Sequence, residues 1–230
     1  MESTNANREY KSSVFASYFS DEEKLIEAYN AIEGKKYPKN TEVRINTLTD
    51  VLFMEQINDV SFLLAGKLIV LIEHQSYRNK NLAVRMLLYI SRVYEKILDN
   101  ENIYRDGLIK IPKPDFIVLY NGDGEYPDKS EMKLSDAFED ADIPDMLELT
   151  VRVYNINQGR NKEILQKSKS LRDYAAFIGR VKENRTKGLA FTEAIKEAVK
   201  YCIDNEIMKD YLENNASEVE NMLLTEFNMD

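Results

Sequence analysis

Two carboxylates and an amide are spaced so that they could act on one metal ion. Asp59 lies in one apolar run of the chain, and Glu73 and Gln75 lie near the end of the next. Gly66 lies between the runs, which predicts a β-hairpin. If the turn is centred on Gly66, residues whose numbers sum to 132 are opposite one another, so Asp59 is expected to face Glu73.

Opposed carboxylates of this kind predict a hard divalent cation. Directly opposed side chains have Cβ atoms ~4.5–5.5 Å apart, and two like charges at that separation destabilise a strand pair unless something positive lies between them. Oxygen ligands without Cys or His favour Mg²⁺ or Mn²⁺. Such an ion polarises a phosphate and lowers the pKa of a bound water, which points to phosphodiester hydrolysis.

Strand alternation assigns Gln75 to the face of Asp59 and Glu73. It assigns His74, the only histidine, to the opposite face, where a hydrogen-bonded packing role is expected. A purely structural interpretation remains open, in which Asp59 begins a strand and Glu73 pairs with a basic residue of the following helix. Residues 68–72 are apolar on both faces, which indicates a central buried strand. A carboxylate at the end of such a strand favours function.

The elements that must position these residues follow from periodicity and turn residues. Pro112 and Pro114 restrict the following strand's first residues to an edge or to the strand's start. The fold class is therefore mixed α/β (α+β). The expected order is two helical pieces within 9–32, a strand at 43–47, hairpin strands at 57–64 and 68–75, a helix at 79–98, a strand at 115–120, an acidic insertion at 123–148, a strand at 149–156, and helices from 160 to 228 with a break near 186–188.

The helix expected at 79–98 is basic and amphipathic. Arg85 and Tyr89 are four residues apart, so they lie on one face of it. Two interpretations are open. Arg85 could lie near a phosphate, or Tyr89 could be a core residue beside a solvated or ion-paired Arg85.

The net charge is −9, which argues against a surface that is basic throughout. Residues 160–187 nevertheless carry nine Lys/Arg against three acids, a net of +6, and residues 193–230 carry three Lys against ten acids, a net of −7. The basic segment is either a DNA-facing strip or part of ordinary solvated helices. A lone Cys202, no apolar run long enough for a bilayer and no secretory pattern at the start predict a cytoplasmic protein without membrane contact.

Three segments together resemble a known bacterial family. They are NDVSF at 58–62, VLIEHQS at 70–76 and RMLLY at 85–89, and YKSSVF at 10–15 also fits that family's opening. The chain resembles the recombination-promoting nuclease/putative transposase family, a branch of the PD-(D/E)xK nuclease superfamily, from about Tyr10 to Tyr120.

The resemblance implies a DNA endonuclease that requires Mg²⁺ or Mn²⁺. Its domain, 1–157, would have a restriction-endonuclease-like αβββαβ core, and 158–230 would be an added helical C-terminal region. Asp59 and Glu73 would be the metal ligands. Gln75 replaces the superfamily's Lys and would orient a water by hydrogen bonding without supplying charge. A first-helix Glu, Glu27 or Glu23, would be an accessory residue of the site.

Two other hypotheses stand beside the nuclease. The negative net charge and the missing Lys fit a catalytically inactive member of the same fold that binds DNA or another protein. The helical C-terminal region could instead drive homo-oligomerisation in an assembly protein.

Overall fold

The computed structural model describes residues 13–45, 59–74, 80–98, 103–104, 106–139 and 147–228. The side chains of residues 45, 59, 68–74 and 225–228 lie outside this description. No helix within these ranges is long and apolar enough to cross a membrane.

One six-stranded mixed sheet forms the centre of the molecule, in the order β1-β2-β3-β4-β6-β5. Strands β3, β4 and β6 are parallel, and the other pairings are antiparallel. The strands are β1 (Val43–Ile45), β2 (Asp59–Leu64), β3 (Lys67–His74), β4 (Lys113–Tyr120), β5 (Lys129–Lys133) and β6 (Thr150–Asn155).

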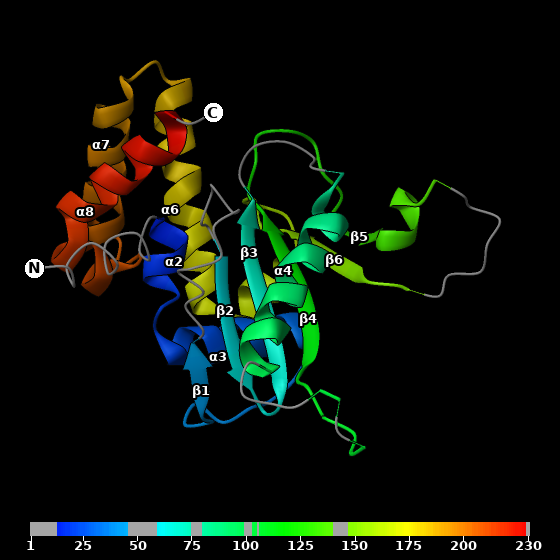
Figure 1. The fold of residues 1–230 in the computed structure, drawn as a ribbon. Coiled ribbons are helices and arrows are strands. Elements are labelled where there is room, and N and C mark those ends of the chain that lie inside the picture. The colour runs from blue at the N-terminus through cyan, green and yellow to red at the C-terminus, as the bar shows by residue number, and fades with distance from the viewer. Residues whose placement is uncertain are drawn as a thin grey trace, which may run out of the picture.

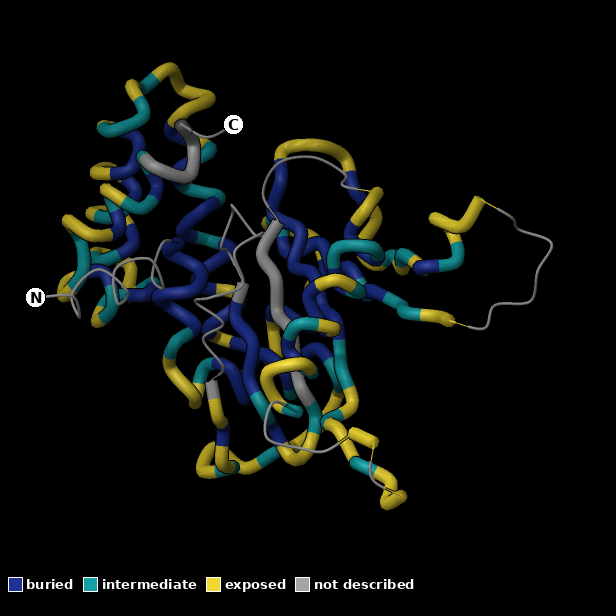
Figure 2. The backbone as a smooth tube through the Cα atoms, viewed as in Figure 1, coloured by how far each residue is buried: buried dark blue, intermediate teal, exposed yellow. Residues whose placement is uncertain are grey.

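Helices cover both faces of the sheet (Figure 1). The helix α4 packs against one face in a smaller apolar cluster, whereas α2, α3 and the C-terminal helices share a larger cluster with the other face. Figure 2 shows the buried segments running through this centre. The helices are α2 (Val14–Tyr18), α3 (Glu22–Glu33), α4 (Leu82–Leu98), the 3-10 helix η1 (Leu134–Ala137), α5 (Lys162–Lys167), α6 (Lys169–Thr186), α7 (Phe191–Asp204) and α8 (Lys209–Asn228).

The element order α3-β1-β2-β3-α4-β4 is the expected αβββαβ core, and the mixed α+β class is confirmed. The helix α3 begins and ends where local chemistry predicts. Asp21 caps α3 by accepting from the backbone amides of Glu23 and Lys24, and Gly34 ends it with a left-handed φ of 63°.

The hairpin register differs by one residue from the expected one. Asp59 pairs with Ile72, not with Glu73, because the pairing closes at Leu64 and Lys67. Ala65 and Gly66 both have positive φ, 48° and 78°, and they form a two-residue turn. A turn of two residues makes paired numbers sum to an odd value, so the assumption of a turn centred on one glycine was wrong.

The acidic insertion contains structure that the sequence pattern did not suggest. Strand β5 lies inside it and pairs antiparallel with β6 at the sheet's edge. Its residues alternate between exposed and half-buried, and Met132 packs against the α4 cluster. The charges of this segment concealed an edge strand, since only one of its faces meets the core.

The C-terminal helices do not have a core of their own among the described residues. Leu171, Tyr174 and Phe177 of α6 are fully buried and belong to the same cluster as Leu119 of β4 and Phe15 of α2. The expected boundary at residues 157/158 falls between β6 and α5, but the apolar core continues across it.

Candidate functional site

The carboxyl ends of the three parallel strands meet at one end of the sheet, the upper end in Figure 1. Glu73 of β3 pairs with Leu119 of β4, and Tyr120 pairs with both His74 and Asn155. In open sheets of this kind, ligands bind outside the carboxyl ends of the strands. This end of the sheet is therefore where a ligand-binding or catalytic site is expected.

The backbones of Asp59 and Glu73 both lie at this end. Strand β2 begins at Asp59, whose partner Ile72 immediately precedes Glu73 on β3. Opposed residues share a face and successive residues alternate, so this register contradicts the expectation from strand parity that Asp59 and Glu73 lie on one face. The side chains of both residues, and Gln75 as a whole, lie outside the described part of the structure.

A network of asparagines fixes the loops after β4 and β6. The Asn157 side-chain amide donates to the Gly122 carbonyl and to Asn155 Oδ1, 3.0 Å in each case. The Asn155 amide donates to the Tyr126 carbonyl (2.9 Å), and the Asn161 amide donates to the Asn155 carbonyl (2.8 Å). These bonds satisfy backbone groups that the strands leave unpaired, and they hold the two loops against each other.

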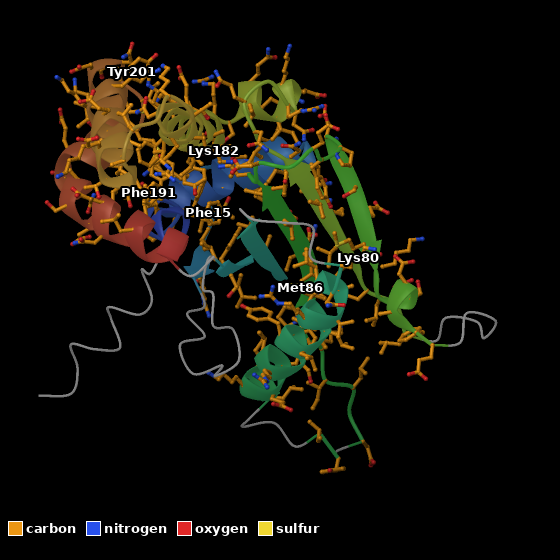
Figure 3. The ribbon with its side chains drawn as sticks, turned by 90° about the horizontal axis from the view of Figure 1, so that it is seen from above. Phe15, Lys80, Met86, Lys182, Phe191 and Tyr201 are labelled. Atoms are coloured by element: carbon orange, nitrogen blue, oxygen red, sulfur yellow. The ribbon has the colours of Figure 1, made fainter. Side chains whose placement is uncertain are left out.

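Lys182 of α6 joins the helical layer to the same end of the sheet. Its ammonium donates to the carbonyl of Asn121, which directly follows β4, and lies 3.0 Å from Asp123 Oδ1. Figure 3 shows Lys182 on the helix. The Asn121 side chain is buried, and its amide nitrogen has no hydrogen-bond partner among the residues described.

Two adjoining cavities open at these loops. The first has a volume of about 310 Å³ and is lined by the segment from Gly122 to Tyr126, by asparagines and by Lys182. The second has a volume of about 300 Å³ and extends along α5 and α6, with Lys162 and Arg172 in its wall. Gln158 and Arg160 line both cavities, so their side chains lie between two adjoining hollows of one depression.

Of the two glutamates considered for the first helix, Glu27 is held inside the fold and Glu23 is not. Glu27 Oε1 accepts from the Ser168 hydroxyl (2.8 Å) and from the backbone amide of Ser170 (2.8 Å). Glu23 is exposed and forms an ion pair with Lys39 at 3.0 Å. Glu27 thus ties α3 to the beginning of α6. No described contact connects Glu27 or Glu23 to Asp59 or Glu73.

The packing interpretation holds for Tyr89. Its side chain is buried in the α4 cluster, and Arg85 is half-buried one turn before it. Met86 of α4, labelled in Figure 3, is fully buried in the same cluster. The helix expected at 79–98 is therefore a core helix whose inward face meets β4 and β6.

A half-buried charge network away from this end of the strands was not predicted from the sequence. Arg152 of β6 forms ion pairs with Glu33 of α3 and Asp115 of β4, and Asp115 also accepts from the Tyr29 hydroxyl at 3.0 Å. Burial and then the neighbouring Asp115 raise the pKa of Tyr29 above its ordinary range. Burial acts to lower the pKa of Arg152, but the two carboxylates outweigh it and raise that pKa. The network joins α3 to the sheet, and no local pattern marks its members.

The described side chains contain no group of three or more His, Cys, Asp or Glu residues able to hold a metal ion. That description does not include the side chains of Asp59 and Glu73. The predicted cation site therefore remains a prediction.

The model of one protein family matches residues 40–212, in a chain of 230. Its description is "Putative transposase, YhgA-like". The chain belongs to this family. The match begins just before β1 and ends in α8, so the YhgA-like region includes α5, α6 and α7, further than the resemblance up to Tyr120 suggested. Searches of curated proteins and of solved structures found no match.

Proposed function

We propose that this YhgA-like protein is a divalent-metal-dependent DNA endonuclease that hydrolyses phosphodiester bonds in recombination or in the movement of a genetic element. The observation that carries the proposal is the position of the family motif within the αβββαβ core. Strand β2 begins at Asp59, and β3 reaches Glu73 beside it, at the carboxyl end of the parallel strands. Family membership adds the expectation of action on DNA.

The donor set suits a hard cation. Asp59 and Glu73 offer carboxylate oxygens from adjacent strands, and this chemistry fits Mg²⁺ or Mn²⁺ better than zinc. In this proposal these two residues would hold the metal. When bound, the ion supplies Lewis-acid polarisation of the scissile phosphate and a bound water of lowered pKa.

Gln75 orients the attacking water in this proposal. Its side-chain amide would hydrogen-bond that water. Gln75 would orient the water but, unlike the Lys of related nucleases, it supplies no positive charge. A neighbouring cation must then supply positive charge, and Lys182 at the Asn121 carbonyl is one at the same end of the sheet.

Plasmid nicking tests the proposal. Supercoiled plasmid is incubated with the wild-type chain in Mg²⁺ or Mn²⁺, and relaxed and linear products are measured on a gel. We expect cleavage by the wild type and a loss on the order of 100-fold or more for Asp59→Ala and Glu73→Ala, the size of effect seen when a group that stabilises the transition state is removed. Glu197→Ala, an exposed change on α7, is the matched control and should cleave normally.

Equal nicking by all variants would contradict the assignment of Asp59 and Glu73. Absence of nicking by the wild type, with DNA binding retained, would favour the alternative of a catalytically inactive nuclease fold that binds DNA or a protein. The net charge of −9 and the Gln at position 75 are the features that favour this alternative.

A further inference from the structure

The depression formed by the two cavities has a floor of small residues on α6. Ala175 and Ala176 line it, and a Cβ added at Gly179 would lie 3.6 Å from Gln158 Oε1. Residues three and four apart share a helix face, so Arg172, this floor and Lys182 follow one stripe of α6. The side chains along the stripe are small, Gln158 lies against it at Gly179, and cations lie at its two ends.

The stripe has a length suited to a polymer. Arg172 and Lys182 are ten residues apart on one helix, a rise of about 15 Å. Arg160 lies between the two cavities and lines both. Successive phosphates of a DNA strand advance by about 3.4 Å along the duplex axis. The cations along the stripe are therefore spaced to meet several consecutive phosphates of one strand.

Its charge is opposite to that of the whole chain. Four Lys/Arg line the two cavities against Asp123 and Glu125, a net of +2, in a protein whose net charge is −9. The second cavity contains no acid in its lining. The four cations are Arg160, Lys162, Arg172 and Lys182.

The ion pairs of these cations are of a kind that a phosphate can replace. Arg160 lies 3.4 Å from Asp128, with both side chains about half exposed, and Arg172 Nε lies 3.7 Å from Asp173. The exposed Arg160–Asp128 pair contributes only ~0–1 kcal/mol. Asp173 is buried but also pairs with Lys169, so Arg172 can turn to a phosphate without leaving that carboxylate unpaired. Arginine binds phosphate more strongly, because its planar group donates two parallel hydrogen bonds.

We propose that this depression, which we call the α5–α6 groove, binds the phosphodiester backbone of the DNA strand that the carboxyl end of the sheet cleaves. The inference rests on the proposed function, because it takes DNA as the substrate. Lys182 contacts the loop directly after β4, and β4 pairs with β3 at Glu73. A strand lying in the groove thus runs toward the Asp59–Glu73 end of the sheet. In this proposal the positive segment at 160–187 binds phosphates of the DNA backbone. Its contacts do not recognise the base sequence.

Binding measured without metal tests the groove independently of cleavage. The full chain is titrated into a fluorescein-labelled 20-base-pair DNA in EDTA, and anisotropy is followed between 50 and 200 mM salt. We expect Arg160→Gln/Arg172→Gln to bind about tenfold more weakly than wild type. Its plot of log K against log salt should be shallower by about 1.8, the contribution of two phosphate contacts.

The matched control is Lys167→Gln/Lys187→Gln, which removes the same charge from exposed positions on α5 and at the end of α6 that do not line the groove. It should keep the wild-type affinity and salt slope. Equal weakening by both double variants would overturn the groove and indicate only a diffuse effect of net charge. Unchanged binding by the groove variant would overturn it as well, provided that its thermal melting matches that of wild type.

The two proposals fail in distinguishable ways. If the chain binds DNA through the groove but does not nick plasmid, the nuclease proposal is wrong and the groove proposal stands. If the chain nicks plasmid, Asp59→Ala is inactive and the groove variant binds DNA normally, the groove proposal is wrong and the nuclease proposal stands.

Discussion

Lys182 and Asn121 are 61 residues apart, yet the lysine ammonium donates to the asparagine carbonyl at the end of β4. The basic composition around Lys182 could be recognised from sequence, but its neighbour could not, because no periodicity links a helix to a loop so distant. Asp59 and Glu73 were easier to identify, since their motif is local. The Arg152 network was missed for the same reason as the Lys182 contact.

Cys202 provides a test at the residue scale. Burial raises the pKa of its thiol from 9.0 to about 12. The folded state therefore keeps the proton at pH values where the unfolded chain has lost it, and the free energy of unfolding should fall as the pH rises from about 9 toward 12. At pH 8 the thiol is also buried and protonated, so we expect it to react with a disulfide reagent far more slowly in the native chain than in denaturant.

Absorbance assays of thiol release, with and without guanidinium, measure that difference. Rapid stoichiometric release from the native chain would show that α7 opens readily around Cys202. Cys202→Ala serves as the control for background release.

At the scale of elements, the positions of strands and helices were predictable and their register was not. Periodicity located β2, β3 and α4 to within a few residues. The pairing of β2 with β3, however, depends on how many residues the turn contains. Ala65 gives no signal for a left-handed conformation, and only the backbone shows that it shares the turn with Gly66. β5 was missed because its outward face carries charges.

The turn makes its own prediction. Ala65 has a φ of 48° and is exposed, and a Cβ added at Gly66, whose φ is 78°, would meet nothing within 4 Å. Any effect of substitution must therefore come from backbone strain rather than from crowding. Ala65→Asn, which suits this conformation, should raise the free energy of unfolding by about 0.5–1 kcal/mol, and Gly66→Ala should lower it by about 1 kcal/mol.

Urea denaturation followed by circular dichroism measures both changes. Lys35→Asn, at an exposed position outside any helix or strand, is a control that should leave the midpoint unchanged. If Gly66→Ala proved as stable as wild type, the two-residue turn and its register would be in doubt.

At the scale of the whole molecule, the helical C-terminal region is part of the main core. Phe15 of α2 and Tyr174 of α6 pack edge to face with ring centroids 5.5 Å apart, and Ile156 lies in the same cluster. Composition could not reveal this, since a basic segment followed by an acidic tail also describes an independent appendage. Only the apolar stripes of these helices indicated that they pack into the main core.

A chain ending after Asn157 should therefore lose cooperative folding. It would expose the apolar face of the sheet that α6 covers, and burial of such surface contributes about 25 cal/mol per Å². Differential scanning calorimetry of residues 1–157 should show no sharp transition, while the intact chain shows one. A cooperative transition in the shortened chain would establish residues 1–157 as an autonomous domain. Size-exclusion chromatography of the intact chain would show whether it also forms homo-oligomers.

The strand order has a consequence for how the chain is assembled during synthesis. β5 is made before β6 but lies outside it, and among the described strands it pairs with β6 alone. β5 therefore cannot join the sheet until the chain has been made through β6, so this edge of the sheet cannot be complete before Asn155 has been added.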